Sequence, residues 1–399
     1  MNKKTHLTLG DKRVAIALIA LSVFGSMMIA SAEMGNSAGD TAYLTGVIIR
    51  QLIYMVVGFI GYFFLTNFRV LKLRTSLYYI AYIVILGALI ACRFFGQING
   101  AYAWIPLPMG ATIQPSEFAK VFMIAFGAKI FGKDKGENNL RNFYIYAGMA
   151  VVYFLVIARI QHDFGSAIVL FIICYCIAMI PSYKELRPIR KWMFIIVVGV
   201  IGLALLMLSN PVTEFLKKHS SNYMIGRFLA AADPFLYQFD NGYHIIMSLV
   251  SFANGGWFGL GYGNSIHKYM NFPNPSNDFI LPVIVEELGI FGFVFLIAMY
   301  ALMLYPIISA SLKTRSLVSK MLFIGVFIYF VTHFILNVGG VSGLIPLTGV
   351  PLLIISSGGS SLIASMASLG LAQNELSRVK KEIDESNSRK IQTDANQNA

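Results

Sequence analysis

Long apolar runs are the feature that most constrains this chain. Runs of about 18 or more apolar residues recur along nearly all of the sequence, and such a run is long enough to cross a membrane as a helix. The length of 399 residues would otherwise suggest two or three soluble domains, but 57% of the residues are hydrophobic and only 13% are charged. This composition excludes an ordinary water-soluble globule. We therefore predict an all-α polytopic membrane protein.

The apolar runs define about ten transmembrane helices within one membrane domain, residues 1–373. The polar tail at 374–399 is rich in Asn, Gln, Ser, Lys and Glu, and we expect it to be disordered. The spans are expected near residues 13–32, 47–67, 75–95, 115–130, 143–160, 165–181, 191–209, 283–306, 321–339 and 351–373.

Lys and Arg residues are distributed unevenly between the two sets of loops. Of the 31, the termini and the loops on one side hold 23, the opposite loops hold five, and three lie within spans. Cytoplasmic loops are enriched in Lys and Arg, so both termini and the tail are predicted to be cytoplasmic. The net charge of +12 then reflects topology. Nucleic-acid binding would require basic residues gathered on one soluble face.

The first apolar run has a second interpretation. Lys3, Lys4 and Arg13 precede it, and it ends in residues 30–32 (ASA), which resemble a signal-peptide cleavage site. Its apolar length is generous for a signal sequence, and we interpret it as a membrane span.

One connection is much longer than the others. Residues 210–282, between the seventh and eighth spans, form a large loop predicted to be extracellular, and a loop of this length is usually functional. Its aromatic and apolar stretches, such as 243–252, predict short helices that lie against or in the membrane.

Four of the 19 acidic residues fall inside or at the mouth of predicted spans. All four are close to an outer end of a span. Charges in a bilayer are costly and usually face a cavity or one another, so this distribution predicts a polar pocket that opens at the outer leaflet. It favours chemistry at the outer surface over transport, which would place ionisable groups near mid-membrane. The four residues are Glu117, Asp163, Glu286 and Glu287.

Two of these acids have structural and functional interpretations. Glu117 and Lys120 are three residues apart and share a helical face, so they form either an internal ion pair or a site where Lys120 attracts an anionic headgroup. Asp163 either caps the sixth helix or belongs to the site.

Asp278 is the strongest catalytic candidate. It follows Pro273 and Pro275, which stiffen the chain, and directly precedes an apolar helix. Capping of that helix is the alternative role. A carboxylate at the rim of a partly apolar cavity is well placed as a general base, because burial adjusts its pKa.

Two glycine-rich stretches flank this region. Residues 255–263 (GGWFGLGYG) lack the strand and helix context of a dinucleotide-binding motif. Residues 356–361 (SSGGSS) include Gly358, Gly359 and Ser360. Such stretches form either amide nests for a phosphate or sites of close helix packing.

Six motifs, taken together and in order, resemble the shape, elongation, division and sporulation (SEDS) family. Within it, the chain is more similar to the cell-division subfamily of Gram-positive bacteria than to the elongation or sporulation subfamilies. The motifs lie at 99–105 (NGAYAWI), 114–120 (QPSEFAK), 161–167 (QHDFGSA), 242–244 (GYH) with 254–256 (NGG), 278–280 (DFI) with 286–289 (EELG), and 343–346 (GLIP) through 358–361 (GGSS).

The resemblance implies a peptidoglycan glycosyltransferase that polymerises lipid II outside the cytoplasmic membrane, at the division septum. It implies a class B penicillin-binding protein and other division proteins of the membrane as partners. Asp278 matches the family's essential outer-loop aspartate, and Glu117 with Lys120 matches its fourth-span pair. The chain departs from common family residues at Ala103, His162, Leu353 and Ser357.

Substrate-binding residues are less well defined. Lys120, Arg227 or Lys268, or a divalent cation (Mg or Mn), would stabilise the departing pyrophosphate, and Glu286 and Glu287 are grouped with them. The three cysteines form neither a disulfide framework nor a metal motif, so the sequence assigns no metal ligands. Alternative functions are a lipid II flippase or other polytopic transporter, an elongation-type polymerase, and a non-catalytic scaffold.

Overall fold

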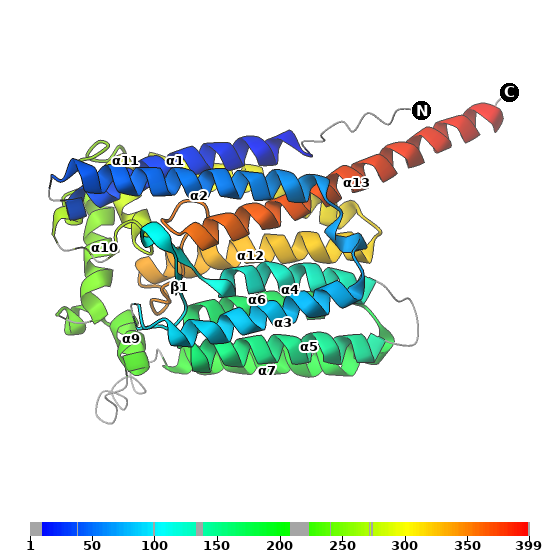
Figure 1. Ribbon diagram of the computed structural model, residues 1–399, viewed down its shortest axis with the longest axis horizontal. Coiled ribbons are helices and arrows are strands. Elements are labelled where there is room, and N and C mark those ends of the chain that lie inside the picture. The colour runs from blue at the N-terminus through cyan, green and yellow to red at the C-terminus, as the bar shows by residue number, and fades with distance from the viewer. Residues whose placement is uncertain are drawn as a thin grey trace.

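The computed structural model describes residues 10–397, with gaps at 38, 99, 133–138, 208–222, 240, 271 and 273. Its long helices run side by side in one bundle, and the described chain begins and ends at the same end of it, which we call the terminal end (Figure 1). The opposite end carries two short helices, α9 (Tyr223–Ala232) and α10 (Asn241–Gly255), and is called the loop end.

Among the described residues, ten helices build the bundle, and each overlaps one of the expected spans. The prediction of an all-α polytopic membrane protein is therefore confirmed. The helices are α1 (Lys12–Ser37), α2 (Thr41–Asn67), α3 (Thr75–Ala91), α4 (Pro115–Gly132), α5 (Asn139–Leu155), α6 (Phe164–Met179), α7 (Arg187–Met207), α11 (Ile280–Lys313), α12 (Leu317–Val341) and α13 (Gly359–Gln397).

Six of the described helices are long and apolar enough to cross a membrane by length and composition. They are α1, α2, α11, α12, α3 extended by the turn η2 (Cys92–Phe94), and α5 extended by the π-helical turn η4 (Val156–Ile160). The apolar helix α6 is shorter, with 16 residues.

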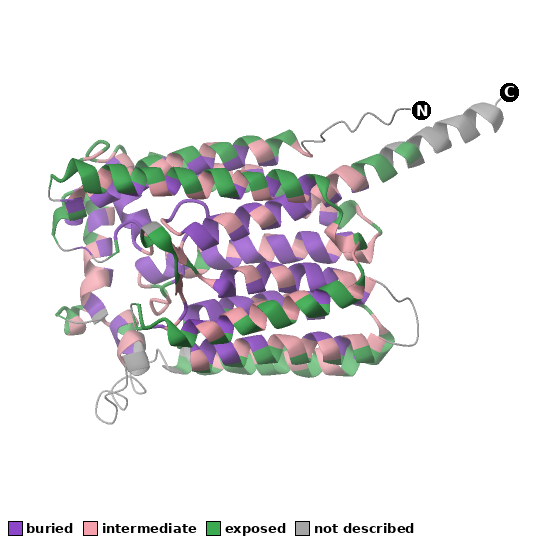
Figure 2. Ribbon diagram, viewed as in Figure 1, coloured by how far each residue is buried: buried purple, intermediate pink, exposed green. Residues whose placement is uncertain are grey.

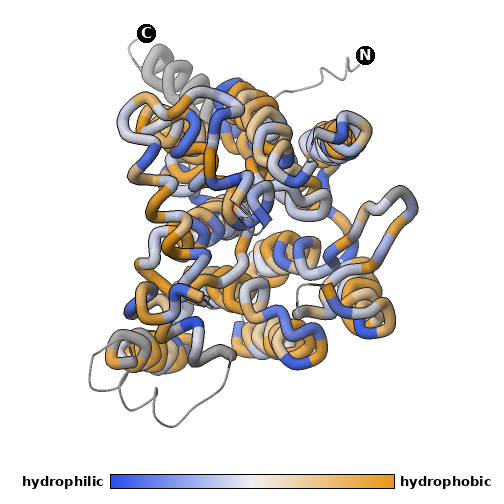
Figure 3. Tube along the Cα trace, turned by 90° about the vertical axis from the view of Figure 1, so that its left-hand side faces the viewer, coloured by the Kyte–Doolittle hydropathy of each residue, from blue (hydrophilic) through white to orange (hydrophobic). Residues whose placement is uncertain are grey.

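The buried core lies in the middle of the bundle, around α4, α6 and α12 (Figure 2). Helices on the outside turn apolar side chains outward, and Ile60, Ile83 and Trp192 are each more than 60% exposed. Viewed from the loop end, hydrophobic residues occupy both the inner and the outer sides of the helices (Figure 3). Outward-facing apolar helices of this kind suit a lipid environment.

Short elements build the loop end. The expected long loop is partly helical, and the stretch 243–252 lies within α10 as predicted. Residues 210–222, Asn99 and Pro273 lie outside the described residues. The other short elements are η6 (Pro234–Tyr237), η7 (His267–Tyr269), and the antiparallel strands β1 (Ile105–Pro106) and β2 (Thr112–Ile113), in which Ile105 pairs with Ile113.

Helix α1 is an integral part of the bundle. Val14, Leu18 and Leu21 are completely buried, and the Oγ atom of Ser31 donates a hydrogen bond of 2.6 Å to Glu287 on α11. The segment resembling a cleavage site therefore lies inside a packed helix, which favours the membrane-span interpretation.

The last helix differs from the expectation at its start. The expected span begins at 351, but α13 begins at Gly359, after a non-helical segment. The structure describes α13 as continuing through the polar tail to Gln397. Several hydrogen bonds hold its middle to the bundle, among them those from Asn374 to the Thr66 carbonyl at 2.7 Å and from Arg378 to Ser319 at 2.6 Å.

Helix α11 is broken at Gly289, where φ is 65° and ψ is −163°. The carbonyls of Glu286 and Glu287 accept hydrogen bonds from the backbone N–H groups of Leu260 and Gly261, both at 2.9 Å. In an unbroken helix these carbonyls would bind the N–H groups of residues 290 and 291, which instead donate to the carbonyls of residues 256 and 257. The loop thus replaces the lost helical bonds.

Glycines permit this close docking of the loop. A Cβ atom at Gly259 would lie 2.2 Å from the Glu287 carbonyl oxygen, and one at Gly289 would lie 2.3 Å from the Trp257 carbonyl oxygen. The stretch 255–263 therefore serves backbone packing against the break in α11, which is the structural interpretation of its glycines.

Candidate active site at the loop end

Asp278 lies immediately before α11, at the loop end of the bundle. The helix is capped by Phe279 without a side-chain hydrogen bond, so Asp278 does not act as its N-cap. None of the described residues donates a hydrogen bond to its carboxylate. The carboxylate lies near Gly349, where an added Cβ atom would lie 3.6 Å from Oδ2 of Asp278. A Cβ atom there would be in ordinary van der Waals contact with the carboxylate, and it is the positive φ of 67° at this position that favours glycine.

The environment of Asp278 changes its acidity. Burial raises the pKa of this carboxyl group to about 6, the positive charge of Arg227 opposes the rise, and the negative charge of Asp163 adds to it. The side chain is partly rather than completely buried by its accessible surface. A carboxylate with a pKa near neutrality can accept a proton during a reaction and release it afterwards.

Arg227 is brought to the site by α9. Its Nη1 atom donates a hydrogen bond of 3.0 Å to the carbonyl of Leu347, within the loop that also contains Gly349. The guanidinium group is thus held on the loop that contains Gly349, and its positive charge lowers the pKa of Asp278.

Asp163 caps α6, as one of its two interpretations predicted. Its Oδ1 atom accepts a hydrogen bond of 3.0 Å from the backbone of Ser166, and its Oδ2 atom accepts one of 2.8 Å from the Gln114 side chain. The negative charge of Asp163 also raises the pKa of Asp278. The structural and electrostatic roles of Asp163 are therefore compatible.

The glycine and serine residues at the start of α13 serve packing. An added Cβ atom at Gly359 would lie 2.5 Å from the ring of Tyr54, and one at Gly358 would lie 2.5 Å from the Ser361 hydroxyl. The hydroxyl of Ser360 accepts a hydrogen bond of 2.8 Å from the backbone of Gln114, the residue that also binds Asp163. These contacts fix α13 against the segment before α4.

Glu117 and Lys120 form an internal ion pair. The distance from Lys120 Nζ to Glu117 Oε1 is 2.7 Å, and the side chains are only 0% and 1% exposed. The Tyr329 hydroxyl donates to the second oxygen of Glu117 at 3.1 Å, and Nε2 of His333 lies 3.3 Å from Lys120 Nζ. This arrangement supports the structural interpretation of the pair.

Lys268, Glu286 and Glu287 form a second buried cluster. Lys268 Nζ lies 2.8 Å from Glu287 Oε1 and donates to the Gly263 carbonyl at 2.7 Å. His267 Nδ1 lies 2.6 Å from Glu286 Oε1. The cluster holds the loop before η7 against α11. Its two glutamates lie about two helical turns beyond Asp278. The polar groups of Lys268, Glu286 and Glu287 are thus directed at one another.

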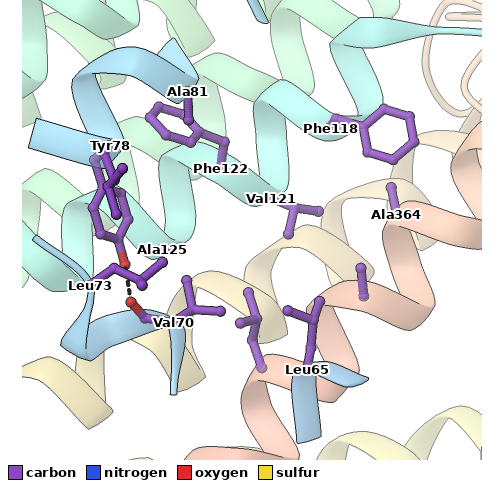
Figure 4. Close-up of a pocket in the computed structure, with 13 residues that line it drawn as sticks. Leu65, Val70, Leu73, Tyr78, Ala81, Phe118, Val121, Phe122, Ala125 and Ala364 are labelled. Carbon is purple, nitrogen blue, oxygen red and sulfur yellow. Dashed lines mark hydrogen bonds between the residues drawn. The ribbon is translucent and has the colours of Figure 1, made fainter. Parts of the chain in front are cut away.

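An apolar groove runs along α4 (Figure 4). Its volume is about 210 Å³. It extends from Phe118 and Ala364, near the loop end of α4 and α13, to Val70 and Tyr78, near the terminal end of α3. All thirteen lining residues are apolar or aromatic. The groove has the character of a site for a hydrocarbon chain rather than for catalysis.

The described residues do not offer a dedicated metal centre. Among them, no group of three or more His, Cys, Asp and Glu side chains is arranged to hold an ion. Asp278 and Asp163 carry carboxylate oxygens, which are the donors that Mg or Mn prefers, but the described residues place no third such ligand with them. No reaction step is routed through a divalent cation.

The sequence analysis missed a row of polar residues on α12. Tyr329, His333 and Asn337 are spaced by four within an apolar helix, and all three are buried. Spacing of four places them on one face. The regular spacing of these polar residues within an apolar run is the sequence signal that could have identified them.

The family model described as "Cell cycle protein", FTSW_RODA_SPOVE, matches residues 12–382. The chain is 30% identical to the Bacillus subtilis protein named Probable peptidoglycan glycosyltransferase FtsW, over 91% of this chain and 90% of that protein. It is 31% identical to Stage V sporulation protein E of the same organism, over 93% and 98%.

A solved structure has the same fold. It is described as "Structural coordination of polymerization and crosslinking by a peptidoglycan synthase complex", and its matching chain has a TM-score of 0.67 and 23% identity. The match covers 93% of this chain and 98% of that chain.

Proposed function

The chain belongs to the FtsW/RodA/SpoVE family, and from this membership we propose that it is a peptidoglycan glycosyltransferase that polymerises lipid II. Its substrate is a disaccharide linked through pyrophosphate to a polyprenyl chain. The relatives named as peptidoglycan glycosyltransferases support this activity, and the carboxylate of Asp278 supplies the chemistry.

Asp278 acts as the general base. Its carboxylate takes the proton from the 4-hydroxyl of the acceptor GlcNAc, and the hydroxyl oxygen forms a bond to the anomeric carbon of the donor MurNAc. The bond from that carbon to the pyrophosphate oxygen breaks, with inversion, and polyprenyl pyrophosphate leaves with the electron pair. A pKa of about 6 leaves Asp278 largely ionised at neutral pH and still basic enough to accept the proton.

Arg227 is the cation best placed to bind the pyrophosphate, because it is held on the loop that contains Gly349 and its charge acts on Asp278. An arginine suits phosphate oxygens through its planar set of donors. Lys120 and Lys268 are instead assigned to structural ion pairs, since both ammonium groups are buried and bonded within the protein.

The apolar groove along α4 holds a polyprenyl tail. Its lining is apolar throughout, and one end lies next to Phe118, in the first turn of the helix that begins beside Gln114. A lipid lying there would extend along the bundle with its polar head toward the loop end.

The loop end lies outside the cytoplasmic membrane and both termini lie inside. The distribution of Lys and Arg supports this orientation. The enzyme acts at the division septum, with a class B penicillin-binding protein and other membrane proteins of the division machinery. The relatives named FtsW support the division role, and the fold shared with a chain of a peptidoglycan synthase complex supports the partnership.

The partly buried Asp278 beside Arg227 is the observation that carries this proposal. The test is polymerisation of labelled lipid II by the purified protein with its partner, for wild type, Asp278→Asn and the control Asp40→Asn. Asp40 is also at the loop end, where it caps α2, and asparagine caps equally well. We expect polymer from wild type and Asp40→Asn only.

Near-normal polymer from Asp278→Asn would contradict the assignment. Proteoliposomes given lipid II on the loop-end face alone separate a polymerase from a flippase. A polymerase makes glycan there without any translocation, whereas a transporter makes none.

A further inference from the structure

We propose that Asn337 is a positioning residue for Asp278, holding its main chain in place from helix α12. The inference rests on the proposed function, since it assigns a role in the same reaction. It concerns a residue that does not touch the substrate and acts through the position of the general base.

The amide of Asn337 joins two loops. Its Nδ2 atom donates hydrogen bonds of 2.9 Å to the carbonyl of Asp278 and of 2.9 Å to the carbonyl of Val350. The two partners lie 59 and 13 residues away in sequence, and Asn337 is only 3% exposed. Both N–H groups of the amide are therefore used to hold the two sides of the site together.

The position of Asp278 depends on its main chain. Its carboxylate receives no hydrogen bond from the described residues, so local side-chain contacts do not fix it directly. Val350 follows Gly349, where an added Cβ atom would lie 3.6 Å from Oδ2 of Asp278. The hydrogen bonds from Asn337 to both carbonyls set the distance between Asp278 and the segment of Gly349 and Val350. A displacement of about 1 Å at a reacting group can lower a rate a hundredfold.

Asn337 is the last of three buried residues on one face of α12. His333, four residues earlier, has Nδ1 at 3.0 Å from the carbonyl of Pro351. A carbonyl only accepts, so Nδ1 carries the proton and Nε2 accepts from Lys120. Tyr329, four residues earlier again, donates to Glu117. This face connects the buried ion pair to the loop beside Asp278.

The bonds of Asn337 are made through its nitrogen alone. Its Oδ1 atom is buried and has no hydrogen-bond partner among the described residues. A side chain without the NH₂ group therefore loses both connections, and a longer amide keeps the donors but displaces them.

The test compares Asn337→Ala, Asn337→Gln and the control Thr332→Ala in lipid II polymerisation with the partner protein present. Thr332 is a buried polar residue of the same helix. For Asn337→Ala we expect kcat to fall at least about tenfold with KM changed less than about threefold, because positioning affects the reaction step. Asn337→Gln should retain intermediate activity, and Thr332→Ala should match wild type.

The pH profile distinguishes positioning from a general loss of folded protein. A released Asp278 becomes more hydrated, so its pKa falls and the acid limb of kcat/KM moves to lower pH in Asn337→Ala. Arg227 and Asp163, the charged groups that face Asp278, are unchanged in this variant. Loss of folded enzyme alone would lower the rate without moving the limb.

Three outcomes would overturn the inference. They are wild-type kcat in Asn337→Ala, an equal loss in Thr332→Ala, and failure of both Asn337 variants to fold, which would assign a purely structural role. Failure of the proposed function is seen separately, because it requires an active Asp278→Asn. If Asp278→Asn is inactive and Asn337→Ala is normal, only the positioning role is rejected.

Discussion

The ammonium group of Lys120 lies 2.7 Å from the carboxylate of Glu117, and neither side chain reaches solvent. The pair joins α4 to α12, because Tyr329 binds Glu117 and His333 binds Lys120. An ion pair buried this completely is stable only while both partners are present, because either charge alone would be left without compensation. It is therefore a structural junction of the bundle.

Removing one partner of this pair should destabilise the protein strongly. For Glu117→Gln we expect the free energy of unfolding to fall by about 3–5 kcal/mol, since Lys120 is left as a buried unpaired charge. The measurement is thermal unfolding of the purified protein in detergent. The double variant Glu117→Leu/Lys120→Met, which removes both charges, should recover much of the loss. A stable but inactive Glu117→Gln would instead place the pair in the reaction.

Activity should depend on pH through Asp278. The base works only when ionised, and burial raises the pKa of Asp278 to about 6, so kcat/KM should rise with pH through about 6 and then level off. Arg227 lowers this pKa and Asp163 raises it. Arg227→Gln should therefore move the acid limb to higher pH and Asp163→Asn to lower pH.

The control for these shifts is Lys313→Gln, which removes a positive charge at the terminal end of α11 and should leave the limb in place. Asn is a good N-cap, so Asp163→Asn should also keep the cap of α6. Shifts of the same sign in Arg227→Gln and Asp163→Asn would contradict the electrostatic assignment.

Asp278→Asn should not destabilise the fold at alkaline pH. The folded-state pKa is raised above the usual value of 3.8, so the folded protein binds a proton more tightly than the unfolded chain. Its stability therefore falls as pH rises from about 4 through 6, and the ionised group is unfavourable above that range. At pH 8 the variant should melt at or above the wild-type temperature. A clear decrease would show that the carboxylate stabilises the fold.

Gly289→Ala should prevent the break in α11 from docking on its loop. The new Cβ atom would lie 2.3 Å from the Trp257 carbonyl oxygen, and the φ and ψ angles at this position are essentially restricted to glycine. We expect little folded protein in membranes, assayed by gel-filtration profile in detergent. Gly87→Ala is the matched control, because nothing lies within 4 Å of a Cβ there. A monodisperse Gly289→Ala would contradict the constraint.

Much of the architecture follows from local sequence. All ten expected spans overlap helices, because the requirement to match the membrane thickness leaves a long apolar run in each segment. Asp278 could also be chosen as the catalytic candidate from sequence, because its motif and its position before an apolar helix are both features of neighbouring residues. The attachment of the first residues of the tail to the bundle could not be read from local sequence, because Asn374 and Arg378 contact Thr66 and Ser319, far away in the chain.

The sequence by itself therefore determined the membrane class, the location of the long helices, the family and the choice of Asp278 as catalytic candidate. Only the tertiary structure decided which charges meet. It paired Lys268 with Glu287, brought Arg227 from another helix to Asp278, and linked Asn337 to the Asp278 carbonyl. Hydropathy is a property of neighbouring residues, whereas a buried charge or amide is satisfied by groups that folding brings from distant segments.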